Sequence, residues 1–213
     1  MNTFSLLKTA IATRMKRSNL TSVIPDFITL AEDRIGQELR TWRMESLETL
    51  SITESDSTVD QPTRCREIKW MKLSGTYERV ITYMPPAVFF DMYGQQGATT
   101  AQTGPPKHFT LQERSILIGP VPDDDYTATA LCILGPVALS DANPSNDLLT
   151  NYPTLYFYAA LVEGFTHVEH EARLIKAEAG YMKALARANK ESRLHNMAGT
   201  PVGIRSIGRR KVV

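Results

Sequence analysis

The chain has 213 residues, of which 42% are hydrophobic and 22% charged, with a formal net charge of +1 at pH 7. This length can bury a substantial core, and the composition excludes wholesale disorder. A whole-surface attraction to nucleic acid is not expected at this charge, and no apolar run approaches the roughly 20 residues that a membrane helix needs.

The first predicted element is a helix over residues 3–17. Its apolar side chains recur at spacings of three or four and so share one face: Phe4, Leu7, Ile11 and Met15. The segment is basic, since four cations and no acid precede Asp26. These cations follow the apolar residues, the reverse of a secretory signal peptide, so we predict no export.

A second helix is predicted over residues 25–44. Pro25 suits the first helical turn, and Asp26 suits the positive end of the helix dipole. The expected buried stripe comprises Ile28, Ala31, Ile35, Leu39 and Trp42.

The middle of the chain predicts a small antiparallel sheet. Short segments rich in β-branched and aromatic residues alternate with turn-forming clusters, over residues 47–53, 66–73, 77–84, 107–112, 115–119 and 126–134. A short helix is expected from the prolines at 85 and 86 to Gly94, packed on the sheet by Phe89, Phe90 and Met92. The low-complexity stretch that follows is predicted to be a loop, either mobile or a contact surface.

Helical periodicity returns after Asn146. One expected stripe comprises Leu155, Ala159, Val162 and Phe165, and a second comprises Ala172, Ile175, Ala179, Met182 and Ala186. A bend at "THVEHEAR", residues 166–173, separates them, which predicts a helical hairpin.

The predicted fold class is therefore α+β. Helices from both chain ends form a bundle, a small antiparallel β-sheet domain is inserted between them, and an extended tail follows. The expected divisions are residues 1–45 for the first bundle helices, 46–140 for the β-rich insertion, 141–197 for the helical hairpin and 198–213 for the tail.

Few residues have a pattern typical of catalysis. His167 and His170, beside Glu163, Glu169 and Glu171, have a spacing that would allow a divalent metal, but a polar solvated bend explains them better. The zinc-protease, phosphate-loop and serine-elbow motifs are absent from the sequence. We predict no catalytic residue, no metal site, no cofactor and no enzymatic activity.

Two further groups of side chains have metal-binding chemistry. Asp123, Asp124 and Asp125 lack the calcium-loop pattern and are predicted to form a turn. Cys65 and Cys132 have no metal-ligand spacing and are predicted to be ordinary small residues in or near strands.

Two stretches resemble the head-to-tail adaptor proteins of tailed bacteriophages. They are "IPDFITLAEDRIGQELRTWRME" and "LIGPVPDDDYTATALCILGPVALSDANPSNDLLTNYPTLYFYAALVEGFTHV". The landmarks are a proline-led helix with acidic and arginine side chains, a GP-x-P turn, and the run LSD-x-NP-x-N-x-LL before a helix that begins at YP. Here they are Pro25, Glu32, Arg34 and Arg40; Gly119, Pro120 and Pro122; and Leu139, Ser140, Asp141, Asn143, Pro144, Asn146, Leu148, Leu149, Tyr152, Pro153, Leu155 and Tyr156.

The resemblance implies a structural virion protein at the head–tail connector, assembled in the host cytoplasm. It implies a ring, dodecameric in this family, with a central channel that DNA crosses without sequence recognition. The expected partners are the portal protein on one face and the tail nozzle, tube or fibres on the other, with no membrane. Within the connecting run, Asp141 or Asn143 is expected to turn the backbone through side-chain hydrogen bonds.

The tail over residues 199–213 is poor material for a helix, because it holds three glycines, a proline and four unbalanced cations. A frayed, solvated terminus is one interpretation. The resemblance implies another, in which the tail leaves its own subunit and docks on the portal. The predicted portal-binding residues are Ile204 and Ile207 in apolar pockets, with Arg205, Arg209, Arg210 and Lys211 against an acidic surface.

Two other functions remain open at this point. A DNA-binding protein would grip phosphates with the basic N-terminal helix and the C-terminal tail, although aromatic residues do not interleave with those cations in the sequence. A small hydrolase would require His167 or His170 for activity.

Overall fold

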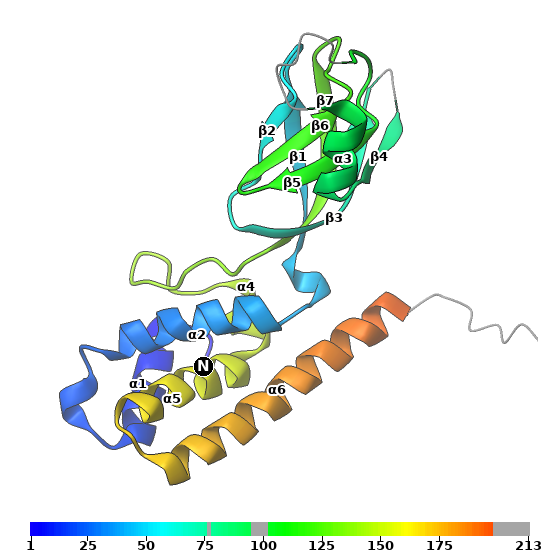
Figure 1. Cartoon of the computed structure of the whole chain (residues 1–213). Helices are drawn as coiled ribbons and strands as arrows, with labels where there is room; N and C mark the ends of the chain where they lie inside the picture. Colours follow the sequence, from blue (N-terminus) through cyan, green and yellow to red (C-terminus); the bar gives the residue numbers. More distant parts are fainter. Residues whose placement is uncertain (76–77, 95–101, 198–213) are drawn as a thin grey trace, which may run out of the picture.

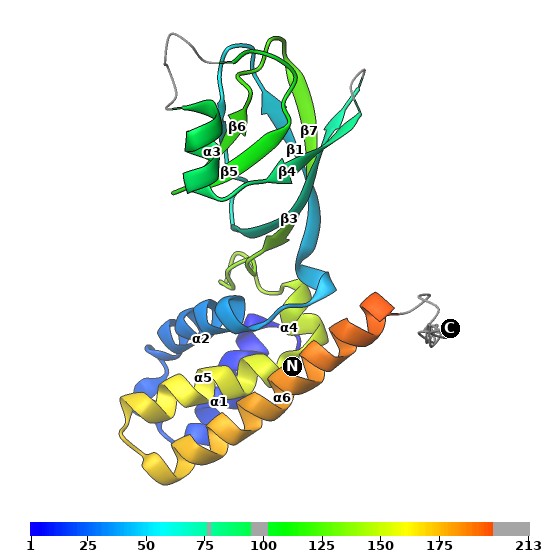
Figure 2. The same cartoon turned by 45° about the vertical axis from the view of Figure 1, so that its right-hand side comes forward.

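In the computed structural model of the chain, which describes residues 1–75, 78–94 and 102–197, the strands stand apart from a helical part built by both chain ends (Figures 1 and 2). The helical part holds α1 (Phe4–Met15), α2 (Ile24–Glu38), α4 (Asp147–Asn151), α5 (Pro153–His167) and α6 (Glu171–Met197). The β part holds β1 (Glu45–Ile52), β2 (Thr58–Asp60), β3 (Cys65–Ser74), β4 (Arg79–Tyr83), α3 (Pro86–Tyr93), β5 (His108–Gln112), β6 (Ser115–Gly119) and β7 (Tyr126–Leu134). The predicted α+β class is confirmed.

Helix α5 is central to the helical part, because it packs against α1, α2, α4 and α6. The stripes predicted for the first helix and for α5 are buried, as expected. Gly164 lets α1 come close: a Cβ at this position would lie 2.9 Å from Met15 Sδ. One apolar core therefore joins segments from the two ends of the chain.

Helix α2 is shorter than the predicted helix over residues 25–44. It ends at Glu38, and Leu39 is extended with φ −81° and ψ 130°. The Arg40 guanidinium donates to the carbonyl oxygens of Gly36 and Leu39 at 3.2 and 2.9 Å, which satisfies acceptors at the helix end. Trp42 begins a short 3₁₀ turn, η2 (Trp42–Met44), instead of continuing the buried stripe.

Contacts with α6 explain this early end. The backbone N–H of Arg40 donates to Asn189 Oδ1 at 3.3 Å, and the N–H of Trp42 donates to Ser192 Oγ at 3.2 Å. These side chains lie about 150 positions away in sequence. The prediction was wrong because it considered only the local helical pattern.

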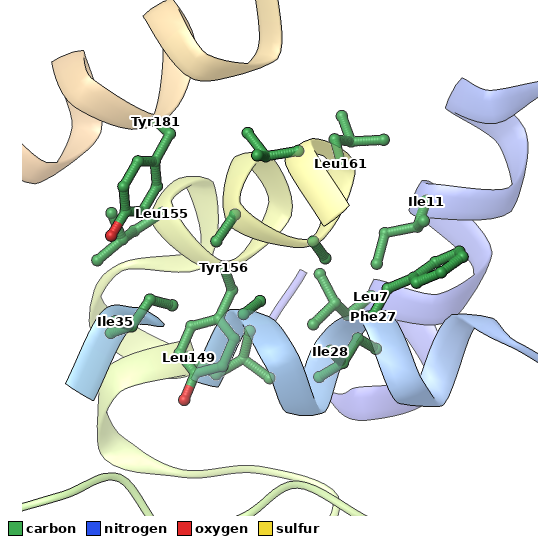
Figure 3. Close-up of a cluster of buried hydrophobic side chains, with 14 of the residues drawn as sticks. Leu7, Ile11, Phe27, Ile28, Ile35, Leu149, Leu155, Tyr156, Leu161 and Tyr181 are labelled. Carbon is green, nitrogen blue, oxygen red and sulfur yellow. The ribbon is translucent and has the colours of Figure 1, made fainter. Parts of the chain in front are cut away.

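Helix α6 also turns a different face to the core from the one predicted. Ile175 and Met182, central to the expected stripe, are 65% and 62% exposed. Ala177, Tyr181 and Ala188 are buried instead, and Figure 3 shows Tyr181 directed from α6 towards α5. Both sets have helical spacing, so periodicity alone did not select the buried one.

The strands form one seven-stranded sheet in the order β1-β7-β3-β4-β5-β6-β2. The sheet is mixed, not antiparallel as predicted, because β4 and β5 run parallel with Thr82 opposite His108. The crossover through α3 allows this, since a parallel pair cannot be joined by a tight hairpin. Strand β2 was not predicted, because its three residues lie within a cluster of turn-forming residues. They form a strand by pairing with β6, where Val59 lies opposite Ile116.

Candidate functional site

The predicted portal-binding residues Ile204, Arg205, Ile207, Arg209, Arg210 and Lys211 lie outside the described residues. Their role therefore stays a prediction.

The histidines that would suit a metal or hydrolase site pack on aromatic rings. The ring centroid of His167 lies 5.3 Å from that of Phe27, and the centroid of His170 lies 6.3 Å from that of Phe165. Over residues 1–75, 78–94 and 102–197, no group of three or more His, Cys, Asp or Glu side chains is arranged to hold a metal ion.

The three consecutive aspartates brace the loop before β7. Asp123 accepts a hydrogen bond from the Tyr126 hydroxyl at 2.7 Å, and Asp125 accepts one from the backbone N–H of Glu54 at 2.8 Å. The Asp125 carboxylate therefore connects the loop before β7 to the loop after β1, at the end of the sheet remote from the helices (Figure 1).

A buried polar network lies where the linker over residues 135–146 returns from the sheet to the helices. Glu32 of α2 is only 6% exposed, and its Oε1 accepts a hydrogen bond from the backbone N–H of Leu139 at 3.0 Å. The Tyr156 hydroxyl of α5 also bonds this carboxyl group. Asn146 donates from Nδ2 to the Tyr156 hydroxyl at 2.8 Å and to the Val137 carbonyl at 2.7 Å.

Asn146 has a second role in the same place. Its Oδ1 accepts a hydrogen bond from the backbone N–H of Leu149 at 2.7 Å, which caps the N-terminus of α4. One amide side chain thus connects the linker, the start of α4 and the middle of α5.

Burial raises the pKa of Glu32 from 4.5 to about 7, although the hydrogen bonds from Leu139 and Tyr156 act in the opposite direction. The sequence analysis grouped Glu32 with the acidic and arginine side chains of the proline-led helix and missed its burial. The signal was available, because Glu32 lies four residues after Ile28 and so falls on the apolar side of the helix.

The linker itself is held by its own side chains and by α1. Asn143, not Asp141, makes the turn. Its side-chain Nδ2 donates to the Ala138 carbonyl at 2.9 Å, and its backbone carbonyl accepts a hydrogen bond from the N–H of Ser140 at 3.0 Å. Asp141 instead forms an ion pair with Lys8 Nζ at 2.8 Å.

Arg64, directly before β3, and Arg66, at the start of β3, complete the junction between the sheet and the helices. Arg66 packs between two glycines, since a Cβ on Gly36 would lie 2.7 Å from its Nη2 and a Cβ on Gly135 would lie 3.0 Å from its Nε. Arg64 donates to the Gly135 carbonyl at 2.9 Å. The Arg66 side chain therefore reaches from β3 to α2 and to the linker through close contacts at two glycines.

The family model described as SU10 adaptor protein matches residues 2–205, nearly the whole chain. The chain belongs to this family of phage head-to-tail adaptors. The resemblance inferred from the sequence is thereby confirmed. None of the curated proteins compared with the chain matches it.

Membership in the SU10 adaptor family makes the chain a structural phage protein and implies a location at the virion neck, in contact with portal and tail proteins. No helix within the described ranges is long and apolar enough to cross a bilayer.

The network places several landmarks of this adaptor together. Glu32, Leu139, Asn146 and Tyr156 come from three separate parts of the sequence and meet around one buried carboxyl group. A fifth landmark, Tyr152, lies 3.4 Å by its hydroxyl from Thr41 Oγ1, just before η2. These residues have structural roles, because their polar atoms are engaged with one another inside the adaptor.

Proposed function

We propose that this adaptor forms a closed ring between the portal and the tail, with twelve copies as in the ring implied by the resemblance, and that DNA crosses its central channel. The observation that carries the proposal is the family match over residues 2–205. The junction supports it physically. A ring that is loaded on two faces needs subunits that do not bend between their two parts. The buried network holds the linker against the helices, and Arg66 reaches from β3 to α2.

We further propose that residues 199–213 anchor the adaptor to the portal. Fifteen extended residues reach roughly 50 Å, enough to cross onto another subunit. Ordering them costs about 1 to 2 kcal/mol per residue, a cost that repeated attachment around a ring offsets. Ile204 and Ile207 would fill apolar pockets on the portal, while the cations meet acidic side chains.

Deleting residues 199–213 should abolish recruitment of the adaptor to portal-bearing heads. Recruitment is measured by co-sedimentation of purified adaptor with heads. The deletion begins after α6 ends at Met197, so the urea unfolding midpoint should not change. As a matched variant, the four cations Arg205, Arg209, Arg210 and Lys211 are replaced with glutamine, which keeps the tail length. Recruitment of this variant should fall below that of the unchanged chain, and the difference should be largest at low salt, where charges are screened least. Undiminished recruitment of the deleted chain would show that the anchor lies elsewhere.

A further inference from the structure

A basic groove lies between α1 and α6 and has α5 as its base. Its volume is about 840 Å³. The floor is apolar and aromatic, formed by Phe157, Tyr158, Leu161 and Phe165. The rims are cationic, with Arg14 and Lys16 at the end of α1 and Arg173 and Lys176 on α6, and no acidic residue lines the groove.

The packing around α5 explains why this groove is open. Helix α6 contacts α5 closely where Gly180 faces Tyr158, since a Cβ on Gly180 would lie 2.5 Å from the tyrosine ring. Helix α1 packs on another side of α5. In Figure 3, Leu161 lies on the side of α5 that faces the space between α6 and α1, whereas α2 lies on the opposite side of α5.

Within residues 1–75, 78–94 and 102–197, the cations of the groove have no acidic partner. Arg14, Lys16 and Lys176 form no ion pair with any residue in the described parts of the chain, and Arg173 only approaches the Phe165 ring, at 6.0 Å from its centroid. Four like charges around an apolar floor repel one another and favour an acidic, amphipathic occupant.

The same chain carries such a surface on α2. Asp26, Leu30, Asp33 and Gln37 follow helical spacing and are exposed. Leu30 is 55% exposed, and Asp26 forms no ion pair with any described residue. Asp33 meets Arg66 at 3.4 Å, but its side chain remains 65% exposed. The stripe therefore presents one leucine between two carboxylates.

We propose that the exposed face of α2 in one copy docks into the basic groove of the next copy. Leu30 would cover the apolar floor, while Asp26 and Asp33 meet the cations of the rims. The two surfaces differ and lie on opposite sides of α5, so the contact is head-to-tail and repeats from copy to copy. The inference rests on the proposed ring and names the surfaces that would build it.

A nucleic acid is the less suitable occupant. The rings of Phe157 and Tyr158 meet edge to face with centroids 5.5 Å apart, and Leu161 is 1% exposed at the base. The tyrosine ring is also engaged with Gly180. Base stacking needs free ring faces, whereas an apolar floor with charged rims suits an amphipathic helix.

Charge reversal on each surface tests the pairing in the full chain. The groove variant is Arg14→Glu with Lys176→Glu, and the helix variant is Asp26→Lys with Asp33→Lys. Each alone should raise the concentration needed for self-association at least about tenfold, because like charges then face each other. An equimolar mixture should regain association, since each reversed surface finds its reversed complement. Sedimentation velocity over a concentration series and counts of rings in micrographs give the readout.

The matched control is Lys183→Glu with Lys190→Glu, which reverses two exposed cations of α6 that do not line the groove. This control should associate as the unchanged chain does and keep its unfolding midpoint. The two reversed variants should unfold slightly earlier than the unchanged chain, because they lose Arg14 in the last turn of α1, or Asp26 in the first turn of α2 together with the contact of Asp33 with Arg66. The mixing experiment is the most informative, because two variants that had merely misfolded would not regain association when mixed.

The outcomes separate the inference from the function. Rings that form equally well with both reversed variants would overturn the docking surfaces and leave the proposed ring intact. If the unchanged chain forms no ring, either free or on portal-bearing heads, the proposed function fails and the inference fails with it. Loss of salt-dependent binding to a short DNA duplex in the groove variant, with association unchanged, would make the groove a nucleic-acid site and overturn the inference.

Discussion

Replacing Asn146 with alanine is expected to lower the free energy of unfolding by about 3 kcal/mol. The substitution removes the cap of α4, which accounts for about 1 kcal/mol. It also leaves the Val137 carbonyl and the Tyr156 hydroxyl without the amide that donates to both. Urea unfolding at pH 7, followed by circular dichroism, measures the change.

Asn19→Ala provides the control for this experiment. Asn19 is exposed in the short turn between α1 and α2, and we expect its replacement to change the free energy of unfolding by less than about 0.5 kcal/mol. If Asn146→Ala behaves like this control, the hydrogen bonds of Asn146 contribute little to stability, and the buried network no longer supports the proposed ring.

Glu32 should make the adaptor less stable as the pH rises from 5 to 8. Its pKa is 4.5 when unperturbed and about 7 in the folded chain, so between these values the folded state holds a proton that the unfolded state releases. Stability falls with pH wherever the folded state binds more protons. Each pH unit in this window costs at most about 1.4 kcal/mol, and we expect a loss of roughly 2 kcal/mol once local relaxation is included.

Glu32→Gln should remove this dependence. A glutamine keeps an acceptor for the Leu139 N–H but carries no charge to bury, so the variant should be the more stable form at pH 8 by up to about 2 kcal/mol relative to the difference at pH 5. Urea titrations of both proteins at half-unit pH steps give the difference curve, in which the contributions of other groups cancel. A flat difference curve would mean that Glu32 keeps an ordinary pKa.

Local patterns predicted much of the fold correctly. The stripe of Phe4, Leu7, Ile11 and Met15 and the stripe of α5 are buried as expected, because each helix offers a single apolar face. The buried face of α6 was predicted wrongly, because this helix has small or apolar residues on two sides. Which of the two sides is buried depends on how Tyr181 packs against α5, and the sequence of α6 alone does not contain this information.

Less of the candidate site than of the fold could be predicted from the sequence. The run from Leu139 to Asn146 was one of the stretches that carried the resemblance to adaptor proteins. Its partner Glu32 lies 107 residues from Leu139 and was grouped with the acidic and arginine side chains of the proline-led helix. The groove was not predicted at all, because Arg14, Phe157 and Lys176 come from three helices and meet only in the folded chain.

Local periodicity and the order of short motifs were enough to predict the α+β class, the helical ends with a β-rich middle, and the adaptor family. Four features became known from the folded chain alone: the residue at which α2 ends, the face of α6 that is buried, the parallel pairing of β4 with β5, and the buried carboxyl group of Glu32. Each of these features depends on contacts between segments that are remote in sequence. The energies of such contacts exceed the local conformational preferences of either segment, so they cannot be predicted from one segment alone.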